Sequence, residues 1–347
     1  MYVAACRKKT LFFRLVFAQN ATMTKHDKPT IFVTRRWPAE AEAALSQHFS
    51  PTFNEGDVPL TASQIADGFA NHDALAPTVS DQITSDIITA GAAGSGQLIA
   101  NFGVGVNHID LPAAAAAGLA VSNTPGVLTD ATADLALTLM LMVSRRAGEG
   151  ERELRAGEWN GWRPTHLMGR SLSGKTLGII GMGRIGKAVA YRAALGFGMK
   201  IIFFNRSKVT DINDYVAKQI DDLDVLCAQS DFVSLHCAAS ADTFHILNED
   251  RLQRMQTHAY VINTARGDVI DEAALLKALH NGSIGGAGLD VFQGEPDIHP
   301  DFLTAPNTVL LPHLGSATVE TRTEMGLKVV ENARAFFAGE RLIDPVL

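Results

Sequence analysis

Short apolar runs alternate with longer helical patterns along most of the 347-residue chain. Ile31–Val33 form the first apolar run, and Pro38 opens a helical stretch, because proline suits the first turn of a helix. Similar short runs return at residues 74–76, 97–101 and 120–121. Strands that alternate with helices in this way predict a parallel sheet with helices on its faces.

A long helical pattern over residues 130–155 separates this series from a second one. Its first half is apolar but too short for a membrane helix of about 20 residues, so we expect it to pack in a core. A loop with Trp159 and Trp162 follows, and the next apolar run begins at Thr176. The order of elements therefore predicts an α/β chain with two doubly wound parallel sheets.

Length and composition agree with two domains. With 347 residues, of which 46% are hydrophobic, the chain is long enough for two cores. Its 30 basic and 37 acidic side chains give a net charge of −7 without a long basic block, which argues against nucleic acid and favours a small-molecule partner. Cys6, Cys227 and Cys237 have neither disulfide nor metal-site spacing, so we expect no metal and a reducing, cytoplasmic location.

The first 28 residues do not fit the alternation. Residues 1–21 pair a basic run with an apolar one, as a weak secretory signal does, although Arg14 interrupts the apolar run. The other interpretation is that translation starts at Met23, just before a polar linker and the first strand. Residues 1–28 are therefore expected to be a disordered extension or an incorrectly assigned start. No stretch of the chain is apolar enough to suggest a membrane span.

A glycine-rich turn joins the apolar run at residues 176–180 to a helical stretch. A G-x-G-x-x-G pattern between a strand and a helix predicts a dinucleotide site, because the glycines allow a tight turn and a close approach of the pyrophosphate. The helix N-terminus adds amide donors and partial positive charge. The residues expected to bind the nucleotide here are Gly181, Gly183, Arg184, Ile185 and Gly186.

The next apolar run, residues 200–204, ends in Asn205-Arg206-Ser207-Lys208. An acidic residue at this place would accept a hydrogen bond from the 2′-hydroxyl of NAD, whereas Arg206 can pair with a 2′-phosphate. This segment therefore predicts NADPH as the cofactor and NADH as the less favoured one. The alternative is that Arg206 and Lys208 are ordinary solvated charges on a turn.

Three later segments place polar residues at the ends of strand-like runs: 261–268, 288–296 and 311–316. In an open α/β sheet, ligands bind beyond the carboxyl ends of the strands, so these polar residues are expected to converge there. The candidates are Arg266, Asp290, Glu295 and His313.

Five ordered motifs carry a resemblance: NFGVGVNHID, GMGRIG, NTARGDVIDE, GLDVFQGEP and LPHLGSAT. From about Ile31 to the C-terminus, the chain resembles the D-isomer-specific 2-hydroxyacid dehydrogenases. Its NRS and GEWNGWRPTHLMG segments look most like the glyoxylate and hydroxypyruvate reductase branch. The resemblance implies a Rossmann coenzyme domain, residues 127–318, inserted into a flavodoxin-like substrate domain of residues 29–126 and 319–347.

The resemblance also implies catalytic roles for three residues. Arg266 would bind the substrate carboxylate and keto oxygen, His313 would donate a proton to that oxygen, and Glu295 would orient His313. These roles suit the chemistry, because a hydride that reaches the carbonyl carbon creates alkoxide charge, which needs an acid and a fixed cation. The implied reactions are reduction of glyoxylate to glycolate and of hydroxypyruvate to D-glycerate.

Further binding residues follow from the same resemblance. Backbone amides at Val104 and Gly105 would hold the substrate carboxylate. Trp162 would cover the active site of the neighbouring subunit of a homodimer, unless it is a buried core residue. Beyond the glycine turn, the implied cofactor contacts are Asn205, Arg206, Ser207, Cys237, Thr264, Asp290 and Gly315.

One segment departs from the family pattern. Residues 236–243 lack the two prolines usual there, which loosens a loop expected beside the adenosine. His236 in this segment is expected to be structural. Three other histidines, His108, His166 and His245, have no convergent partner that the sequence identifies.

Two other functions compete with the reductase. One is an NAD-dependent dehydrogenase of the phosphoglycerate or D-lactate type, which Arg206 disfavours. The other is a non-catalytic, dinucleotide-sensing protein like the corepressors related to this family, which the presence of Arg266, Glu295 and His313 does not exclude.

Overall fold

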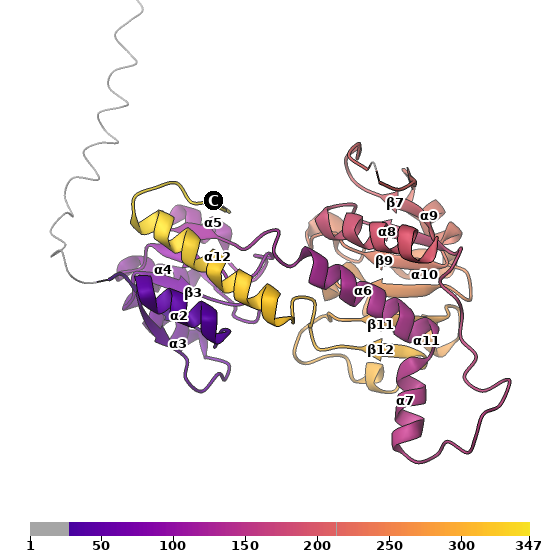
Figure 1. The fold of residues 1–347 in the computed structure, drawn as a ribbon. Helices are drawn as coiled ribbons and strands as arrows, with labels where there is room; N and C mark the ends of the chain where they lie inside the picture. The colour runs from indigo at the N-terminus through magenta and orange to yellow at the C-terminus, as the bar shows by residue number, and fades with distance from the viewer. Residues whose placement is uncertain (1–27, 213) are drawn as a thin grey trace, which may run out of the picture.

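The structure is a computed structural model that describes residues 28–212 and 214–347. The expectation for residues 1–28 therefore lies, except for Lys28, outside the described residues. Figure 1 shows two lobes, each built on a sheet, with the C-terminal helix α12 (Val319–Phe337) lying on the first lobe. The predicted α/β class with two parallel sheets is confirmed.

The first lobe contains a five-stranded parallel sheet with the order β2-β1-β3-β4-β5, the order of flavodoxin-like folds. The central strand β3 and its neighbour β4 are wholly buried, as expected when helices cover both faces. The strands are β1 (Thr30–Val33), β2 (Ser50–Phe53), β3 (Ala74–Ala76), β4 (Leu98–Ala100) and β5 (Ala120–Ser122). The helices are α2 (Ala39–His48), α3 (Ala62–Ala70), α4 (Ser85–Ala93) and α5 (Leu111–Ala116).

The end of the chain returns to the first lobe. Helix α12 packs against α2 and β4, where Val329 and Ala333 join the core around Ile31. After this helix, Pro345 pairs with Ser122 in an antiparallel bridge at the edge of the sheet. The first sheet is therefore completed by two distant parts of the sequence.

The second lobe contains a seven-stranded parallel sheet with the order β12-β11-β10-β9-β6-β7-β8. The chain starts in the middle at β6 and runs first to one edge and then to the other, as in a Rossmann fold. The strands are β6 (Thr176–Ile180), β7 (Lys200–Phe204), β8 (Ala217–Gln219), β9 (Phe232–Leu235), β10 (Tyr260–Asn263), β11 (Gly286–Leu289) and β12 (Thr308–Leu310). The helices are α6 (Thr129–Ser144), α7 (Ala147–Arg155), α8 (Arg184–Phe197), α9 (Leu223–Gln229), α10 (Glu249–Arg254) and α11 (Glu272–His280), with 3₁₀ turns η1 (Ala241–Thr243), η2 (Gly267–Val269) and η3 (Pro300–Leu303).

The predicted continuous helix over residues 130–155 is wrong, because the chain breaks at Arg146, which has a left-handed φ of 52°. The apolar half becomes α6, which packs against α8 and strands β10 to β12 of the second lobe. The polar half becomes α7, which has no buried residue. Among the described residues, no helix is long and apolar enough to cross a membrane.

Close packing of α3 against α4 makes a test of the first core. Phe69 is fully buried, and a Cβ added at Gly91 would overlap its ring. We expect Gly91→Ala to lower the free energy of unfolding by about 1 to 3 kcal/mol, because the ring has no space to move. Urea unfolding measures this change.

Gly196 in α8 provides the control, because a Cβ there meets no atom within 4 Å. Gly196→Ala should leave stability unchanged or raise it by up to about 1 kcal/mol, since alanine favours the helix. Equal effects of the two substitutions would contradict this account of the packing.

Candidate active site

The glycine turn follows β6 and begins α8, and each glycine meets a different constraint. Gly181 has a φ of 98°, and a Cβ there would lie 2.6 Å from the amide nitrogen of Cys237. A Cβ at Gly186 would collide with the carbonyl oxygen of Gly181. Gly183 alone faces open space, with no atom within 4 Å of its added Cβ. The turn therefore packs tightly on β9 while its outer side leaves room for a phosphate at the helix N-terminus.

Asn205, directly after β7, joins the glycine turn to the turn that carries Arg206. Its Oδ1 accepts from the amide of Met182 at 3.2 Å, and its Nδ2 donates to the carbonyl oxygen of Ser207 at 3.0 Å. The side chains of Arg206, Ser207 and Lys208 are exposed. Arg206 forms no ion pair with any residue that the structure describes, so its guanidinium remains available to an anion.

His313 and Glu295 form a pair at the carboxyl ends of the strands. His313 Nδ1 lies 2.7 Å from Glu295 Oε2, and the side chains are 31% and 33% exposed. Glu295 Oε1 accepts from the amide of Phe292 at 2.7 Å. Burial tends to raise the pKa of Glu295, but the hydrogen bond and charge of His313 outweigh it and hold this pKa below its ordinary value. The carboxylate thus fixes the proton on Nδ1 and leaves Nε2 for a reacting group.

Asp290 holds the turn that presents His313. The turn has a φ of 54° at His313, and the two amides after it, of Leu314 and Gly315, donate to Asp290 Oδ1 and Oδ2 at 2.6 and 2.8 Å. Thr132 of α6 adds a hydrogen bond from Oγ1 to the carbonyl oxygen of Gly315 at 3.0 Å. Burial raises the pKa of Asp290 to about 6, although both amides favour its ionised form.

Arg266 extends from the end of β10 towards the first lobe. A Cβ at Gly105 would overlap its Nη2 atom, so the guanidinium lies directly against the loop after β4. Burial lowers the pKa of Arg266, while the charge of Glu295 raises it. Arg266 thus brings a half-buried cation to the glycine loop, a position at which a carboxylate could be bound.

The remaining predicted residues lie in different environments. Val104 accepts a hydrogen bond at its carbonyl oxygen from Asn123 Nδ2 at 2.8 Å. Thr264 is buried, and its hydroxyl has no hydrogen-bond partner among the described residues. Trp162 is 81% exposed, so the alternative that it is a core residue is wrong. Burial raises the pKa of Cys237 to about 11, which keeps the thiol protonated beside the glycine turn.

The histidines left without a sequence partner each have one in the structure. His108 Nε2 lies 3.0 Å from Asn101 Oδ1, His166 Nε2 lies 2.7 Å from Glu153, and His245 Nε2 lies 2.8 Å from Gln293 Nε2. The sequence did not show these pairs, because the partners of His166 and His245 lie far along the chain. Asn101 is close in sequence to His108, at a strand end before two glycines, and that position could have identified it.

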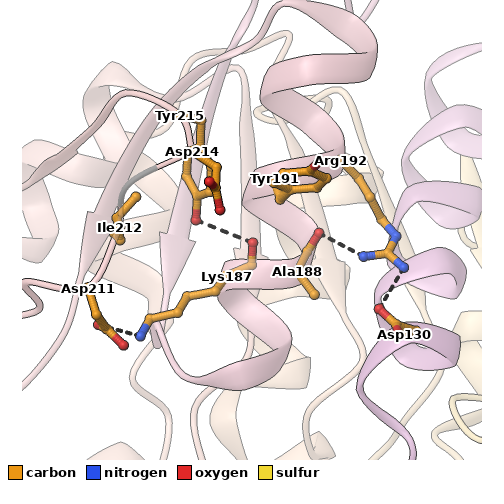
Figure 2. Close-up of a pocket in the computed structure, with 9 residues that line it drawn as sticks. All are labelled: Asp130, Lys187, Ala188, Tyr191, Arg192, Asp211, Ile212, Asp214 and Tyr215. Carbon is orange, nitrogen blue, oxygen red and sulfur yellow. Dashed lines mark hydrogen bonds and ion pairs between the residues drawn. The ribbon is translucent and has the colours of Figure 1, made fainter.

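A separate hollow of about 630 Å³ lies over α8, away from His313 (Figure 2). Its charged groups largely pair with one another, as in Lys187 with Asp211 and Arg192 with Asp130. Arg192 also binds Asp134, so it attaches the start of α6 to α8. This hollow contributes no residue to the candidate active site.

The residues at the carboxyl ends of the second sheet fit a bound dinucleotide. Gly183 leaves space beside the N-terminus of α8, and the buried Thr264 hydroxyl lacks a partner. Exposed Arg206 lies just after the end of β7, the second strand of this lobe, where the ribose is expected. Among the described residues, no group of three or more potential metal ligands occurs.

Comparisons with known proteins agree with this geometry. The family model for the D-isomer-specific 2-hydroxyacid dehydrogenase NAD-binding domain matches residues 137–315. A glyoxylate reductase from Thermococcus litoralis is 40% identical over 317 residues, which cover 90% of this chain and 95% of that protein. The chain belongs to the D-isomer-specific 2-hydroxyacid dehydrogenase family. It is thus an oxidoreductase with an NAD(P)-binding Rossmann domain.

Other members of the family match over nearly the whole fold. A glyoxylate reductase from Korarchaeum cryptofilum is 41% identical, over 90% of this chain and 94% of that protein. The crystal structure of a putative family member from Polaromonas has a TM-score of 0.87 at 38% identity and covers 92% of this chain and 100% of its own. The NADPH-dependent glyoxylate/hydroxypyruvate reductase from Sinorhizobium meliloti, solved with NADP and malonate, has a TM-score of 0.82 at 33% identity, over 92% of this chain and 97% of that one.

The raised pKa of Asp290 predicts a pH dependence of stability. Between pH 4 and about 6 the folded state binds the Asp290 proton more tightly than the unfolded state, so the stability due to this proton is lost as the pH rises through that window. The Asp290→Asn variant lacks this titration. Its stability relative to wild type should therefore increase by about 2 to 3 kcal/mol between pH 4 and pH 7.

Urea unfolding of the cofactor-free proteins at several pH values measures this difference. A wild-type advantage that stays constant, or that grows as the pH rises, would mean that Asp290 ionises in the folded protein at least as easily as in the unfolded chain.

Proposed function

We propose that this enzyme reduces small 2-keto acids, glyoxylate and hydroxypyruvate, with NADPH and with His313 as the acid. The observation that carries the proposal is the His313–Glu295 pair beside Arg266, whose guanidinium lies against the loop at Gly105. The names of the relatives from Thermococcus litoralis and Sinorhizobium meliloti support this substrate class. NADPH is supported by Arg206 and by the Sinorhizobium meliloti reductase.

In the proposed mechanism, the amides of Val104 and Gly105 and the guanidinium of Arg266 bind the substrate carboxylate. Arg266 also polarises the carbonyl oxygen and stabilises the charge that develops on it. Bound NADPH supplies a hydride to the carbonyl carbon. His313 donates its Nε2 proton to the same oxygen, and the Nδ1–H of the neutral imidazole keeps donating to the Glu295 carboxylate.

The cofactor would lie along the carboxyl ends of β6, β7 and β9 to β11. The glycine turn, with Gly181, Gly183 and Gly186 and the amides of Arg184 and Ile185, would bind the pyrophosphate. The turn after β7 would bind the adenosine ribose and its phosphate. The nicotinamide half would lie near Cys237, Thr264, Asp290 and Gly315, where the Thr264 hydroxyl has no other partner.

The proposal extends to the architecture around the site. We place the substrate domain at residues 29–126 and 319–347 and the coenzyme domain at 127–318, as the separate sheets suggest. We also propose a homodimer in the cytoplasm, in which Trp162 reaches the active site of the neighbouring subunit. Its 81% exposure leaves the indole free for such a contact.

Loss of the acid is the first test of the reaction. His313→Ala should lower kcat with glyoxylate and NADPH by about 10²- to 10⁴-fold, because proton donation by a positioned group contributes this much. NADPH oxidation, followed by absorbance, measures it with glyoxylate, hydroxypyruvate, pyruvate and phenylpyruvate.

His258→Ala is the matched control, since His258 also pairs with a carboxylate, Asp231 Oδ1, at 2.7 Å but lies near the amino end of β10. It should leave kcat unchanged. A wild-type protein that binds NADPH but reduces none of the four acids would favour a dinucleotide-sensing role instead.

Nucleotide preference is tested at Arg206. Arg206→Asp should lower kcat/KM for NADPH by about ten- to a hundredfold, because the carboxylate repels the 2′-phosphate and the charged hydrogen bonds are lost. Lys200→Asp makes the same charge change at the opposite end of β7 and should leave the preference intact. If Arg206→Asp keeps the wild-type ratio of NADPH to NADH efficiency, Arg206 is only a solvated charge.

A further inference from the structure

The loop between β4 and α5 is folded around the side chain of Asn101. Asn101 is fully buried, and its Nδ2 donates to the carbonyl oxygens of Gly103 at 3.0 Å and Gly105 at 3.1 Å. A second side-chain amide, Asn123 Nδ2, donates to the carbonyl oxygen of Val104 at 2.8 Å. Three successive carbonyl groups of the loop are thus held by two asparagines.

These contacts set the direction of two backbone amides. In a planar trans peptide, the carbonyl oxygen and the amide hydrogen point in opposite directions. Asn101, bound to the Gly103 carbonyl, therefore turns the N–H of Val104 away from itself, and Asn123 does the same for the N–H of Gly105. No described residue accepts a hydrogen bond from either N–H. Both donors lie in the loop against which Arg266 is packed.

His108 completes the hydrogen bonding of the Asn101 amide. Because Asn101 Nδ2 is used by the two carbonyl groups, its Oδ1 must face His108 Nε2, 3.0 Å away, and Nε2 must be the donor. Burial and, to a smaller extent, the charge of Arg266 lower the pKa of His108 to about 4 against the opposing effect of Asp81, so the ring stays neutral near neutral pH. A reversed Asn101 amide would turn its Oδ1 towards the carbonyl oxygens of Gly103 and Gly105, which is unfavourable because two acceptors would then face a third one.

The backbone of His108 is itself anchored. Its carbonyl oxygen accepts from the amide of Ile83 at 2.7 Å, and the amide of Asp110 donates back to Ile83 at 3.0 Å. His108 is only 8% exposed. The chain of contacts therefore runs from a fixed segment of the first lobe, through His108 and Asn101, to the loop.

We propose that His108, Asn101 and Asn123 are positioning residues that aim the amides of Val104 and Gly105 at the substrate carboxylate. This inference rests on the proposed function, which assigns those amides to the carboxylate. The three side chains act through the backbone and do not touch the substrate. Their loss should therefore weaken binding of the acid more than it slows the chemical step.

A pair of variants at one position separates hydrogen bonding from packing. His108→Met removes the donor, whereas His108→Gln has similar length and keeps an N–H. We expect His108→Met to raise the KM for glyoxylate and the Ki of oxalate by about three- to tenfold, the loss of roughly one neutral hydrogen bond. kcat and the Kd of NADPH should change by less than about twofold, and His108→Gln should restore most of the affinity.

Asn123→Ala tests the same proposal without a change in the core, because Asn123 is only partly buried. It should raise the KM and the Ki in the same way. His72→Met is the control: His72 bonds Gly68 O at 2.7 Å and Thr52 Oγ1 at 2.8 Å elsewhere in the first lobe. It should lower stability without changing the KM or the Ki.

Two results would overturn the positioning role: unchanged oxalate affinity in both His108→Met and Asn123→Ala, or a fall in NADPH affinity that matches the fall in oxalate affinity. Failure of the proposed function is a separate result. If the wild type reduces no 2-keto acid, calorimetric titration with oxalate still tests the loop. Absence of oxalate binding by the NADPH-loaded wild type then overturns the inference as well.

Discussion

The geometry of the candidate site depends on how the backbone is hydrogen-bonded where the parallel strands end. Beyond a strand, amide and carbonyl groups lose their partners in the sheet and need others when they are buried. Here a short polar side chain at or directly after the strand supplies them, as short side chains of this type do in turns. These residues are Asn101 after β4, Asn123 after β5, Asn205 after β7, Asn263 at the end of β10 and Asp290 after β11.

Each of these residues organises a loop that carries a functional group. Asp290 binds the turn that presents His313, and Asn263 binds the turn before Arg266 through Ala265 N at 2.9 Å and Arg266 O at 2.8 Å. The carbonyl groups and amides of the loops are therefore fixed before any ligand arrives. Such preorganisation lowers the cost of ordering the site when a ligand binds.

Much of the fold could be predicted from the sequence because burial leaves a direct pattern. Parallel strands covered on both faces read as short apolar runs, and the glycine motif between a strand and a helix has few other uses. The predicted boundaries of the helices were less accurate. Residues 130–155 have a continuous helical pattern, and the sequence does not indicate that Arg146 takes a left-handed backbone conformation.

The candidate site was predictable in its residues but not in its contacts. Arg266, Glu295 and His313 could be identified because they follow strand-like runs, where ligands bind in an open α/β sheet, and because they lie in motifs that resemble the family. Thr132, which binds the carbonyl oxygen of Gly315 in the turn after His313, lies 183 residues away in sequence, so its role comes from three-dimensional proximity alone. His245 shows the same limit, since its partner Gln293 lies 48 residues away in sequence.

Asn205 has a consequence for changing the cofactor of this enzyme. Because the same amide side chain binds Met182 in the glycine turn and Ser207 beside Arg206, the positions of these two turns are coupled. An aspartate at position 205 would keep an acceptor for the amide of Met182 but lose the donor to Ser207, and so would loosen the turn that carries Arg206. Substitutions intended to change nucleotide selectivity are therefore better placed at Arg206 and Lys208 than at Asn205, which binds both turns.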